Sequence, residues 1–407
     1  MVIWLINHYA VPAKYYPLIR TANFAKYLMR FGYEVIVFSA SSVHNGAINL
    51  STNEKSFQEE TVDGIHHVYV RCHSYRGNGL ERIYNMFEFA FRLEGVCNKF
   101  PKPDMILSSS ATPLACKAGL QIAKKYKVRA VAEIVDLWPE SFVAYGLVSK
   151  SNPLLMPMYL FEKKMYEFAD DIIFSFEGGY DYIKERGWEK DIPRHKVHYI
   201  NNGVDLEAFD YNKEHYQIGD EDLQNEEIFK VVYTGSIRRV NNVGKLLDVA
   251  KRIHNQRIKF LIWGKGDELA SLERRVKAES IQNVVFKGYA DKIYIPYITS
   301  CADLNILHSE SSAVLRFGIS LNKMFDYMAA GKPIFVDFFC KYNPVLQCDA
   351  GAVSSSLAID DIAKGIEAFV DMDDEMYETY CQNARKGAEK YDFKYLTDNL
   401  LQIMMGD

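Results

Sequence analysis

The chain has 407 residues, of which 48% are apolar and 25% charged, and this composition is that of a soluble globular protein. Because a single hydrophobic core stops growing at roughly 250 to 300 residues, the length predicts two domains. The net charge of −5 argues against a nucleic-acid partner, and no apolar run reaches the roughly 18 residues that a membrane-spanning helix needs.

Apolar runs alternate with helical stretches through the first 200 residues. The first run, "VIWLINHY", lacks a basic leader and a small-residue cleavage site, so we expect a β-strand there and not a signal peptide. Further strands are expected at "EVIVFSA", "IHHVYVR", "DMILSSS", "VRAVAEIVD", "DIIFSF" and "KVHYIN". This alternation predicts an α/β domain with a doubly wound parallel sheet over residues 1–200.

Charge is distributed unevenly along the chain. Through residue 200 there are 24 Lys and Arg against 21 Asp and Glu, and the remainder has 24 against 32. A mildly basic first half suits an anionic membrane surface, and residues 82–102, "RIYNMFEFAFRLEGVCNKFPK", are the best candidate patch. The alternative is an ordinary helix, and the helical spacing of Tyr84, Phe87 and Phe91 favours aromatic side chains that face the core.

The same pattern restarts after the turn "NNGVD" and an acidic linker. Strands are expected at "KVVYTGS", "IKFLIWG", "NVVFKGY", "ADLNILH", "KPIFVDF" and "GAVSSS". They predict a second Rossmann-like domain over residues 201–392. The chain ends in two helical stretches, near 374–391 and 393–405. We expect the last helix, residues 393–407, to pack back on the N-terminal domain.

Cations and glycines follow several strands of the second half, where the ligands of open α/β sheets bind. "YTGSIRR" contains Gly235, Arg238 and Arg239, and "WGKGDE" contains Lys265. None of the glycine patterns is a GxGxxG fingerprint or a P-loop, so neither a dinucleotide dehydrogenase nor an ATPase has support. A nucleotide-diphosphate site without a Walker motif remains.

A short helix is predicted in "SLNKMFDYMAAGKP", residues 320–333, with Gly331 and Pro333 at its end. If it begins at such a site, its amides and the Lys323 ammonium can hold a diphosphate, whose charge grows as it leaves. Asp326, one turn on, can accept hydrogen bonds from vicinal hydroxyls. The alternative is structural, with Asp326 favouring the helix dipole and pairing with Lys323.

The order and spacing of these motifs resemble glycosyltransferase family 4, a GT-B class of retaining enzymes. In the second half the resemblance is carried by "YTGSIRR", "WGKGDE", "VVFKGYAD", "CADLNILHS" and "SLNKMFDYMAAGKP". In the first half, "INHYAVP", "DLWPES" and "INNGVD" resemble a bacterial subgroup that builds surface polysaccharides. The resemblance implies a GT-B fold, in which two Rossmann-like domains face a central cleft.

The resemblance also implies the reaction. It is the transfer, with anomeric retention, of a hexosamine or deoxyhexosamine from a UDP-linked sugar to a polyprenyl-diphosphate-linked saccharide, in capsule, O-antigen or exopolysaccharide biosynthesis. The location implied is the cytoplasm, at the inner face of the cell membrane. The seven cysteines fit this location, because they are odd in number and include no CxxC pair.

Three residues are candidates for catalysis. Lys323 would bind phosphate, and the Arg239 guanidinium offers bidentate donors to the leaving group. Asp136, which heads "DLWPES", could orient or deprotonate the acceptor hydroxyl, or could instead cap a helix before Pro139. His8, Arg20 and Glu177, near other strand ends, are weaker candidates.

The candidates for donor binding include Asp326, which the resemblance assigns to the ribose hydroxyls. The others are Asn322, Arg238, Lys265, Gly235, Gly318 and Leu321. Two of them depart from the family pattern. Gly318 stands where the first carboxylate of a Glu-x7-Glu motif is usual, so backbone amides around "FGIS" are expected to contact the sugar, and Leu321 replaces a frequent proline.

We expect no cofactor and no metal requirement. The DxD-like groups Asp220/Asp222 and Asp371/Asp373 lie in an acidic linker and an acidic helix, where solvated charge is the simpler interpretation. Two other functions remain open: a GT-B enzyme that epimerises a sugar nucleotide or resembles a phosphorylase, and a non-catalytic sugar-nucleotide-binding module. Neither accounts for the "DLWPES" resemblance.

Overall fold

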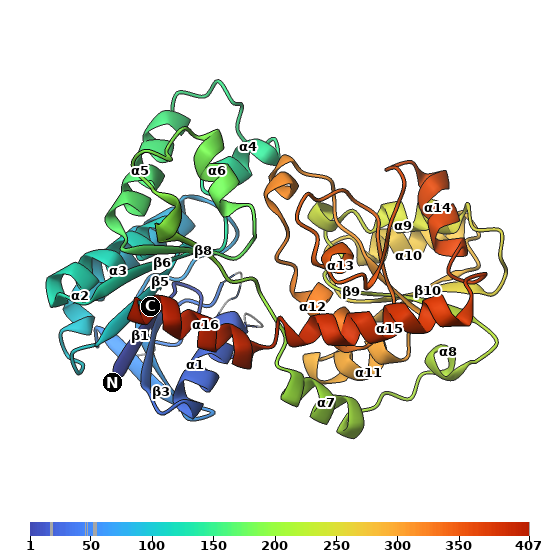
Figure 1. The fold of residues 1–407 in the computed structure, drawn as a ribbon, viewed down its shortest axis with the longest axis horizontal. Coiled ribbons are helices and arrows are strands. Elements are labelled where there is room, and N and C mark those ends of the chain that lie inside the picture. The colour runs from blue at the N-terminus through green and yellow to red at the C-terminus, as the bar shows by residue number, and fades with distance from the viewer. Residues whose placement is uncertain (17–18, 45, 47, 52–54, 407) are drawn as a thin grey trace. The chain divides into compact units, whose positions relative to one another are not determined.

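The computed structural model describes residues 1–16, 19–44, 46, 48–51 and 55–406 (Figure 1). The chain divides into two compact units. Unit 1 comprises Met1–Asn201 and Phe393–Asp407, and unit 2 comprises Asn202–Asp392. Both units are α/β, so the predicted fold class is confirmed.

Unit 1 contains an eight-stranded sheet in the order β3-β4-β2-β1-β5-β6-β7-β8. Its strands are β1 Val2–Ile6, β2 Glu34–Ala40, β3 Phe57–Val62, β4 Ile65–Val70, β5 Met105–Ser109, β6 Arg129–Ile134, β7 Asp171–Phe174 and β8 Val197–Tyr199. The seven predicted strands are present and pair in parallel. The sequence analysis missed β3, an edge strand that runs antiparallel to β4 after a tight turn in which Asp63 and Gly64 both have positive φ.

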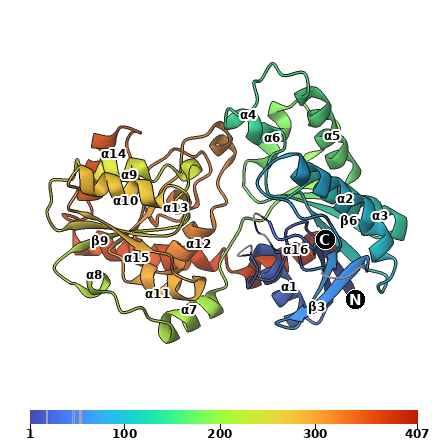
Figure 2. The same ribbon diagram turned by 180° about the vertical axis from the view of Figure 1, so that it is seen from behind.

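Helices cover both faces of this sheet. They are α1 Arg20–Arg30, α2 Leu80–Cys97, α3 Pro113–Tyr126, α4 Glu140–Ala144, α5 Leu155–Phe168, α6 Gly179–Glu185 and α16 Phe393–Met405. Side chains alternate along β1, so Ile3 and Leu5 join the core beneath α1 and α16, while the Trp4 ring meets that of Tyr126 on α3. Figures 1 and 2 both show α16 beside α1, although α1 ends at Arg30 and α16 begins only at Phe393.

The predicted packing of α2 is wrong. Tyr84, Phe87 and Phe91 are exposed, Phe91 to 88% of its area, whereas Phe89 and Leu93 fill the core. Apolar residues occupy two faces of this helix, so a spacing of three and four residues is satisfied twice and does not decide which face is buried. The structure thus leaves an aromatic stripe in solvent.

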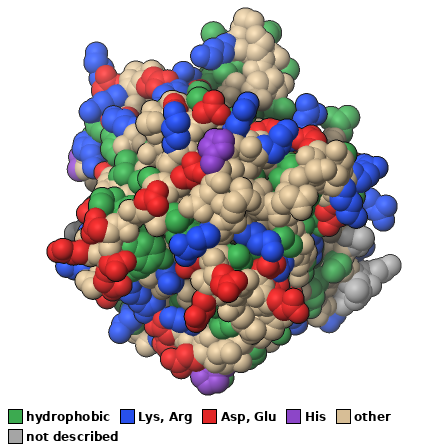
Figure 3. Space-filling model, turned by 90° about the vertical axis from the view of Figure 1, so that its right-hand side faces the viewer, with side chains coloured by type: hydrophobic (Ala, Val, Ile, Leu, Met, Phe, Trp, Pro, Cys, Tyr) green, Lys and Arg blue, Asp and Glu red, His purple; other side chains and the backbone are tan. Residues whose placement is uncertain are grey.

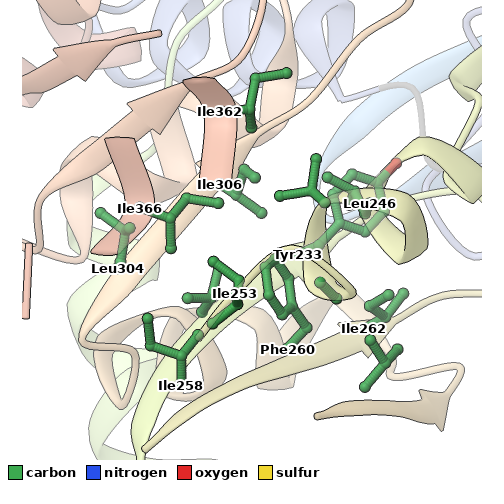
Figure 4. Close-up of a cluster of buried hydrophobic side chains, with 14 of the residues drawn as sticks. Tyr233, Leu246, Ile253, Ile258, Phe260, Ile262, Leu304, Ile306, Ile362 and Ile366 are labelled. Atoms are coloured by element: carbon green, nitrogen blue, oxygen red, sulfur yellow. The ribbon is translucent and has the colours of Figure 1, made fainter. Parts of the chain in front are cut away.

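Unit 2 contains a six-stranded parallel sheet in the order β11-β10-β9-β12-β13-β14. The strands are β9 Phe229–Thr234, β10 Ile258–Trp263, β11 Val284–Gly288, β12 Leu304–Leu307, β13 Ile334–Val336 and β14 Gly351–Val353. Each lies where a strand was predicted. Figure 4 shows the core on one face, where Tyr233, Phe260 and Ile306 from the strands meet Ile362 and Ile366 of α14.

Helices again lie on both sides of the strands. They are α7 Leu206–His215, α8 Glu221–Gln224, α9 Gly244–Ala250, α10 Leu269–Ala278, α11 Ile295–Ser300, α12 Asn322–Ala329, α13 Pro344–Gln347, α14 Ile359–Glu367 and α15 Asp374–Glu389. On the face drawn in Figure 3, acidic and basic side chains are interspersed. Among the described residues of either unit, no helix has the length and apolarity to cross a bilayer.

Candidate functional site

The loops after β9 and β10 lie directly on one another at the carboxyl edge of the unit 2 sheet. The amide of Ile237 donates to the carbonyl oxygen of Lys265 at 3.0 Å. A Cβ at Gly264 would overlap the carbonyl oxygen of Gly235, and one at Gly266 would overlap that of Ile237. Only glycine allows this approach, and it brings backbone groups and the predicted cations to one edge.

Helix α12 begins at Asn322, as predicted, and places Lys323 against these loops. The Nζ atom lies 4.1 Å from the centroid of the Tyr233 ring and donates a 3.4 Å hydrogen bond to the His308 carbonyl oxygen. A Cβ at Gly235 would come within 3.3 Å of the same Nζ. Burial lowers the pKa of Lys323 from its ordinary value.

No ion pair joins Lys323 to Asp326 in the described part of the chain, so the pairing that the structural alternative required is absent. Binding by either residue stays a prediction. The Asp326 carboxylate is half-buried and makes no hydrogen bond or ion pair within the described residues. Burial raises its pKa, an effect that the nearby Lys292 cation opposes. One short helix therefore presents a cation without a counter-ion and a carboxylate without a donor, three residues apart.

Three further predicted cations are exposed at the same edge of the sheet. Arg238 precedes a single 3-10 turn that begins at Arg239, and neither guanidinium has an ion-pair partner in the described ranges. The Lys265 ammonium lies 3.8 Å from the centroid of the Tyr289 ring. All three cations are thus exposed at the edge of the sheet where the ligands of open α/β sheets bind.

The loop before α12 is held in one conformation. Gly318 has φ +114°, which a residue with a side chain rarely adopts, and Leu321 is the N-cap residue with no capping side chain. The Asn202 amide of the "INNGVD" motif donates to the Ser320 carbonyl oxygen at 2.9 Å. Asn322, the first helical residue, is exposed. No side chain caps the first turn of α12 within the described residues, and its Met324 amide donates to the Leu321 carbonyl oxygen at 3.0 Å.

The sequence analysis missed a buried pair beneath Lys323. The Nδ1 atom of His308 lies 2.5 Å from Oδ2 of Asp337, and its Nε2 lies 3.0 Å from the Asn242 carbonyl oxygen. Both side chains are buried, and each ring nitrogen of His308 faces an oxygen atom. His308 and Asp337 directly follow β12 and β13, so their position at strand ends was the available indication.

In unit 1, Asp136 lies in the loop after β6 and its side chain is exposed. Helix α4 begins at Glu140 with Pro139 as its N-cap, so Asp136 does not cap it, and that alternative is wrong. Desolvation raises the pKa of Asp136, while the Arg82 cation lowers it. The Arg82 Nε donates to the Tyr9 hydroxyl at 3.0 Å, which places a cation at this edge of the sheet.

The weaker unit 1 candidates have different environments. His8 is fully buried, its Nε2 lies 2.7 Å from the Asn85 side-chain oxygen, and burial lowers its pKa to about 3. Arg20 pairs with Glu133 at 2.8 Å and donates to the Ile200 carbonyl oxygen, so it joins elements of the fold. Glu177 is exposed.

The DxD-like group in the linker is not solvated charge, and that expectation is wrong. Lys287 Nζ lies 2.7 Å from Asp220 and 2.6 Å from Asp222, and Lys259 lies 2.6 Å from Asp222. The two carboxylates thus fasten α8 to β10 and β11. Asp373 caps α15 through the Met376 amide. No group of His, Cys, Asp or Glu within the described residues is arranged to hold a metal ion.

Comparisons with known proteins match both halves of the chain. Residues 19–208 match the Glycosyltransferase Family 4 model, and residues 218–387 match the Glycosyl transferases group 1 model. A relative is the "Putative colanic acid biosynthesis glycosyl transferase WcaI" of Escherichia coli, 21% identical over 316 residues, which are 72% of this chain and 73% of that protein.

Solved structures of GT-B glycosyltransferases have the same fold. Sucrose-phosphate synthase from Thermosynechococcus elongatus has a TM-score of 0.72 and 16% identity, over 99% of this chain and 98% of that one. HepE of Anabaena, in complex with UDP and glucose, has a TM-score of 0.66 and 13% identity, over 100% and 99%. The two sheets and the matched models define a glycosyltransferase of the GT-B class. Its first half is similar to Glycosyltransferase Family 4 and its second half to the Glycosyl transferases group 1 family.

Proposed function

We propose that this glycosyltransferase moves a hexosamine or deoxyhexosamine from a UDP-linked donor to a polyprenyl-diphosphate-linked saccharide, with anomeric retention, in surface-polysaccharide biosynthesis. The observation that carries the donor assignment is α12, whose Lys323 ammonium and Asp326 carboxylate have no ion-pair partner within the described residues. The HepE structure with UDP and the name of the WcaI relative support the donor and the pathway class.

In this proposal the bond between the anomeric carbon and the diphosphate oxygen breaks, and a bond to the acceptor oxygen forms. Lys323, the amides at the start of α12 and Arg239 stabilise the charge that develops on the diphosphate. Arg238 and Lys265 add positive potential at the same edge of the sheet. Because side-chain cations supply this charge, the proposal needs no metal ion.

The remaining roles position the two substrates. Asp326 accepts hydrogen bonds from the ribose hydroxyls, and backbone groups near Gly235 and Gly318 approach the diphosphate and the sugar. Asp136 in unit 1 orients the acceptor hydroxyl or removes its proton. The acceptor is a membrane lipid, so we place the enzyme at the inner face of the cell membrane.

A panel of UDP-, GDP-, dTDP- and ADP-linked sugars tests the donor. A ligand present at 100 times its dissociation constant stabilises the folded state by about 2.7 kcal/mol, so thermal unfolding identifies the preferred base. Release of UDP that depends on a polyprenyl-diphosphate-linked saccharide then tests the reaction. Isomerisation of the donor without transfer would instead identify an epimerase, and binding without turnover a binding module.

A further inference from the structure

The connection between α4 and α5 exposes apolar side chains on a segment with almost no charge. From Ser141 to Phe161 the single charged residue is Lys150. Exposed apolar side chains are frequent within this stretch, and Met156 reaches 79% and Leu147 72% exposure. The full set is Tyr145, Leu147, Leu154, Met156, Met158 and Leu160. We call residues 145–160 the α4–α5 surface; it forms the top of unit 1 in Figure 1.

These side chains are not needed by the core of unit 1. Helix α5 turns Leu155, Met165 and Tyr166 inward, and these residues are buried. Its other side carries Met156 and Leu160 into solvent, where a helix of a globular protein usually has polar residues. An apolar surface of this extent indicates an interaction site.

The acidic side chains at the two ends of this surface are turned inward. Glu140 accepts a 2.6 Å hydrogen bond from the Tyr159 hydroxyl and is buried. Glu162 accepts hydrogen bonds from the hydroxyls of Tyr166 and Tyr182, and burial raises its pKa to about 8. The exposed side chains of the α4–α5 surface are therefore apolar apart from Lys150 and the small hydroxyls of Ser149 and Ser151, and none of them is acidic.

We propose that the α4–α5 surface inserts into the headgroup region of an anionic lipid bilayer. This inference rests on the proposed function, and it assigns the membrane contact to a segment other than α2. The segment follows β6 and Asp136, so it lies on the side of the sheet where we place the acceptor. Apolar side chains enter the acyl boundary, and the long stem of Lys150 lets its ammonium remain among anionic headgroups.

Charge favours lipid over a second copy of the chain. In a two-fold contact through this surface, Lys150 would meet an identical patch that also contains one cation and no exposed carboxylate. Like charges at an interface disfavour association, whereas anionic headgroups complement Lys150.

Co-sedimentation of the full chain with vesicles tests this inference. We expect the wild type to bind vesicles that contain phosphatidylglycerol and to bind phosphatidylcholine vesicles less, with binding that weakens as salt is added. Leu154→Ser/Met156→Ser should lower the partition coefficient about tenfold or more, because two inserted apolar side chains are lost. The matched control, Leu346→Ser/Met376→Ser, changes two exposed apolar residues of unit 2 and should leave partitioning within about twofold.

Phe87→Ser/Phe91→Ser, on the exposed face of α2, decides between the two surfaces. If this variant alone lost vesicle binding, α2 would be the contact and the inference would be overturned. Vesicle binding that survives Leu154→Ser/Met156→Ser, or a wild-type dimer that this variant dissociates, would overturn it as well.

Donor binding measured without vesicles separates this inference from the proposed function. It should be equal in the wild type and in Leu154→Ser/Met156→Ser, and an unchanged thermal transition of unit 1 should show that the variant is folded. Loss of donor specificity in the nucleotide panel would contradict the proposed function and leave the membrane contact standing.

Discussion

Lys323 occupies a position that the local structure disfavours. The N-terminus of a helix carries partial positive charge, so a cation in its first turn costs stability where an anion would add about 0.3 to 1 kcal/mol. The ring of Tyr233 and the carbonyl oxygen of His308 offset part of this cost, but no carboxylate of the described chain pairs with the ammonium. A bound diphosphate would supply the missing anion.

Replacing Lys323 with alanine should lower turnover by roughly 100-fold or more, because one charge-assisted contact to a developing anion is worth some 2.7 kcal/mol. Steady-state kinetics with the preferred donor measure this loss. Lys364→Ala, which removes an exposed cation of α14, is the matched control and should retain full activity. A folded Lys323→Ala enzyme with activity within about threefold of wild type would remove Lys323 from the mechanism.

Asp326→Asn keeps the shape of the side chain but makes its hydrogen bonds neutral, so nucleotide binding should weaken by about 1 to 3 kcal/mol. A donor with a 2′-deoxyribose tests the assigned contact. The wild type should discriminate against it, and the variant should have lost most of that discrimination, because coupling appears only between groups that touch. Unchanged discrimination would show that Asp326 does not bind ribose.

Nucleotide binding should also weaken at both low and high pH, because the pKa values of Asp326 and Lys323 are shifted toward each other. Burial raises the pKa of Asp326, so its ionised form, which accepts from both hydroxyls, is lost as pH falls through that raised pKa. Burial lowers the pKa of Lys323, so its charge is lost as pH rises. Isothermal titration across pH should therefore show binding that weakens on both sides, and Asp326→Asn should remove the acidic limb.

At the level of elements, most strands could be predicted from the sequence, but the buried face of α2 could not. Buried parallel strands such as β9 and β10 contain apolar runs, "VVY" and "FLIW", and these runs indicated the strands. The edge strand β3 has four charged or polar residues among its six, so no such run marked it. The choice between the two apolar faces of α2 depends on what packs against it, which a local pattern does not contain.

The candidate site also contains residues that the sequence indicated and residues that it did not. Lys323, Asp326 and Gly235 could be named as candidates because they lie within quoted motifs, and their binding roles stay predictions. The His308–Asp337 pair joins residues 29 positions apart in the sequence, and only the pairing of β12 with β13 brings them together. Contacts between strand ends depend on sheet order, which no single motif specifies.

Helix α5 contains a carboxyl group that should make stability depend on pH. Burial raises the pKa of Glu162 from 4.5 to about 8, so the folded state keeps a proton that the unfolded state has released. Its stabilising contribution is present below pH 4.5 and is lost as pH rises to about 8. Glu162→Gln keeps a neutral side chain, so it should remove this pH dependence of the free energy of unfolding, which amounts to up to a few kcal/mol between pH 4.5 and about 8. Thermal melts over this pH range measure the change. An identical slope in the variant would show that Glu162 is ionised in the folded protein.

At the level of the whole molecule, the C-terminal helix ties the end of the chain to unit 1, whereas the predicted donor site lies within unit 2. Leu400 of α16 is buried in the cluster that contains Phe24 and Leu28 of α1.

Leu400→Ala should therefore destabilise unit 1 by about 2 to 5 kcal/mol, the usual cost of such a cavity. Differential scanning calorimetry should show a lower transition for unit 1 and an unchanged shift of the unit 2 transition by UDP. Tyr395→Ala, at an exposed position of the same helix, is the control and should alter neither. If Leu400→Ala abolished the UDP shift, nucleotide binding would depend on unit 1, and the assignment of the whole donor site to unit 2 would be wrong.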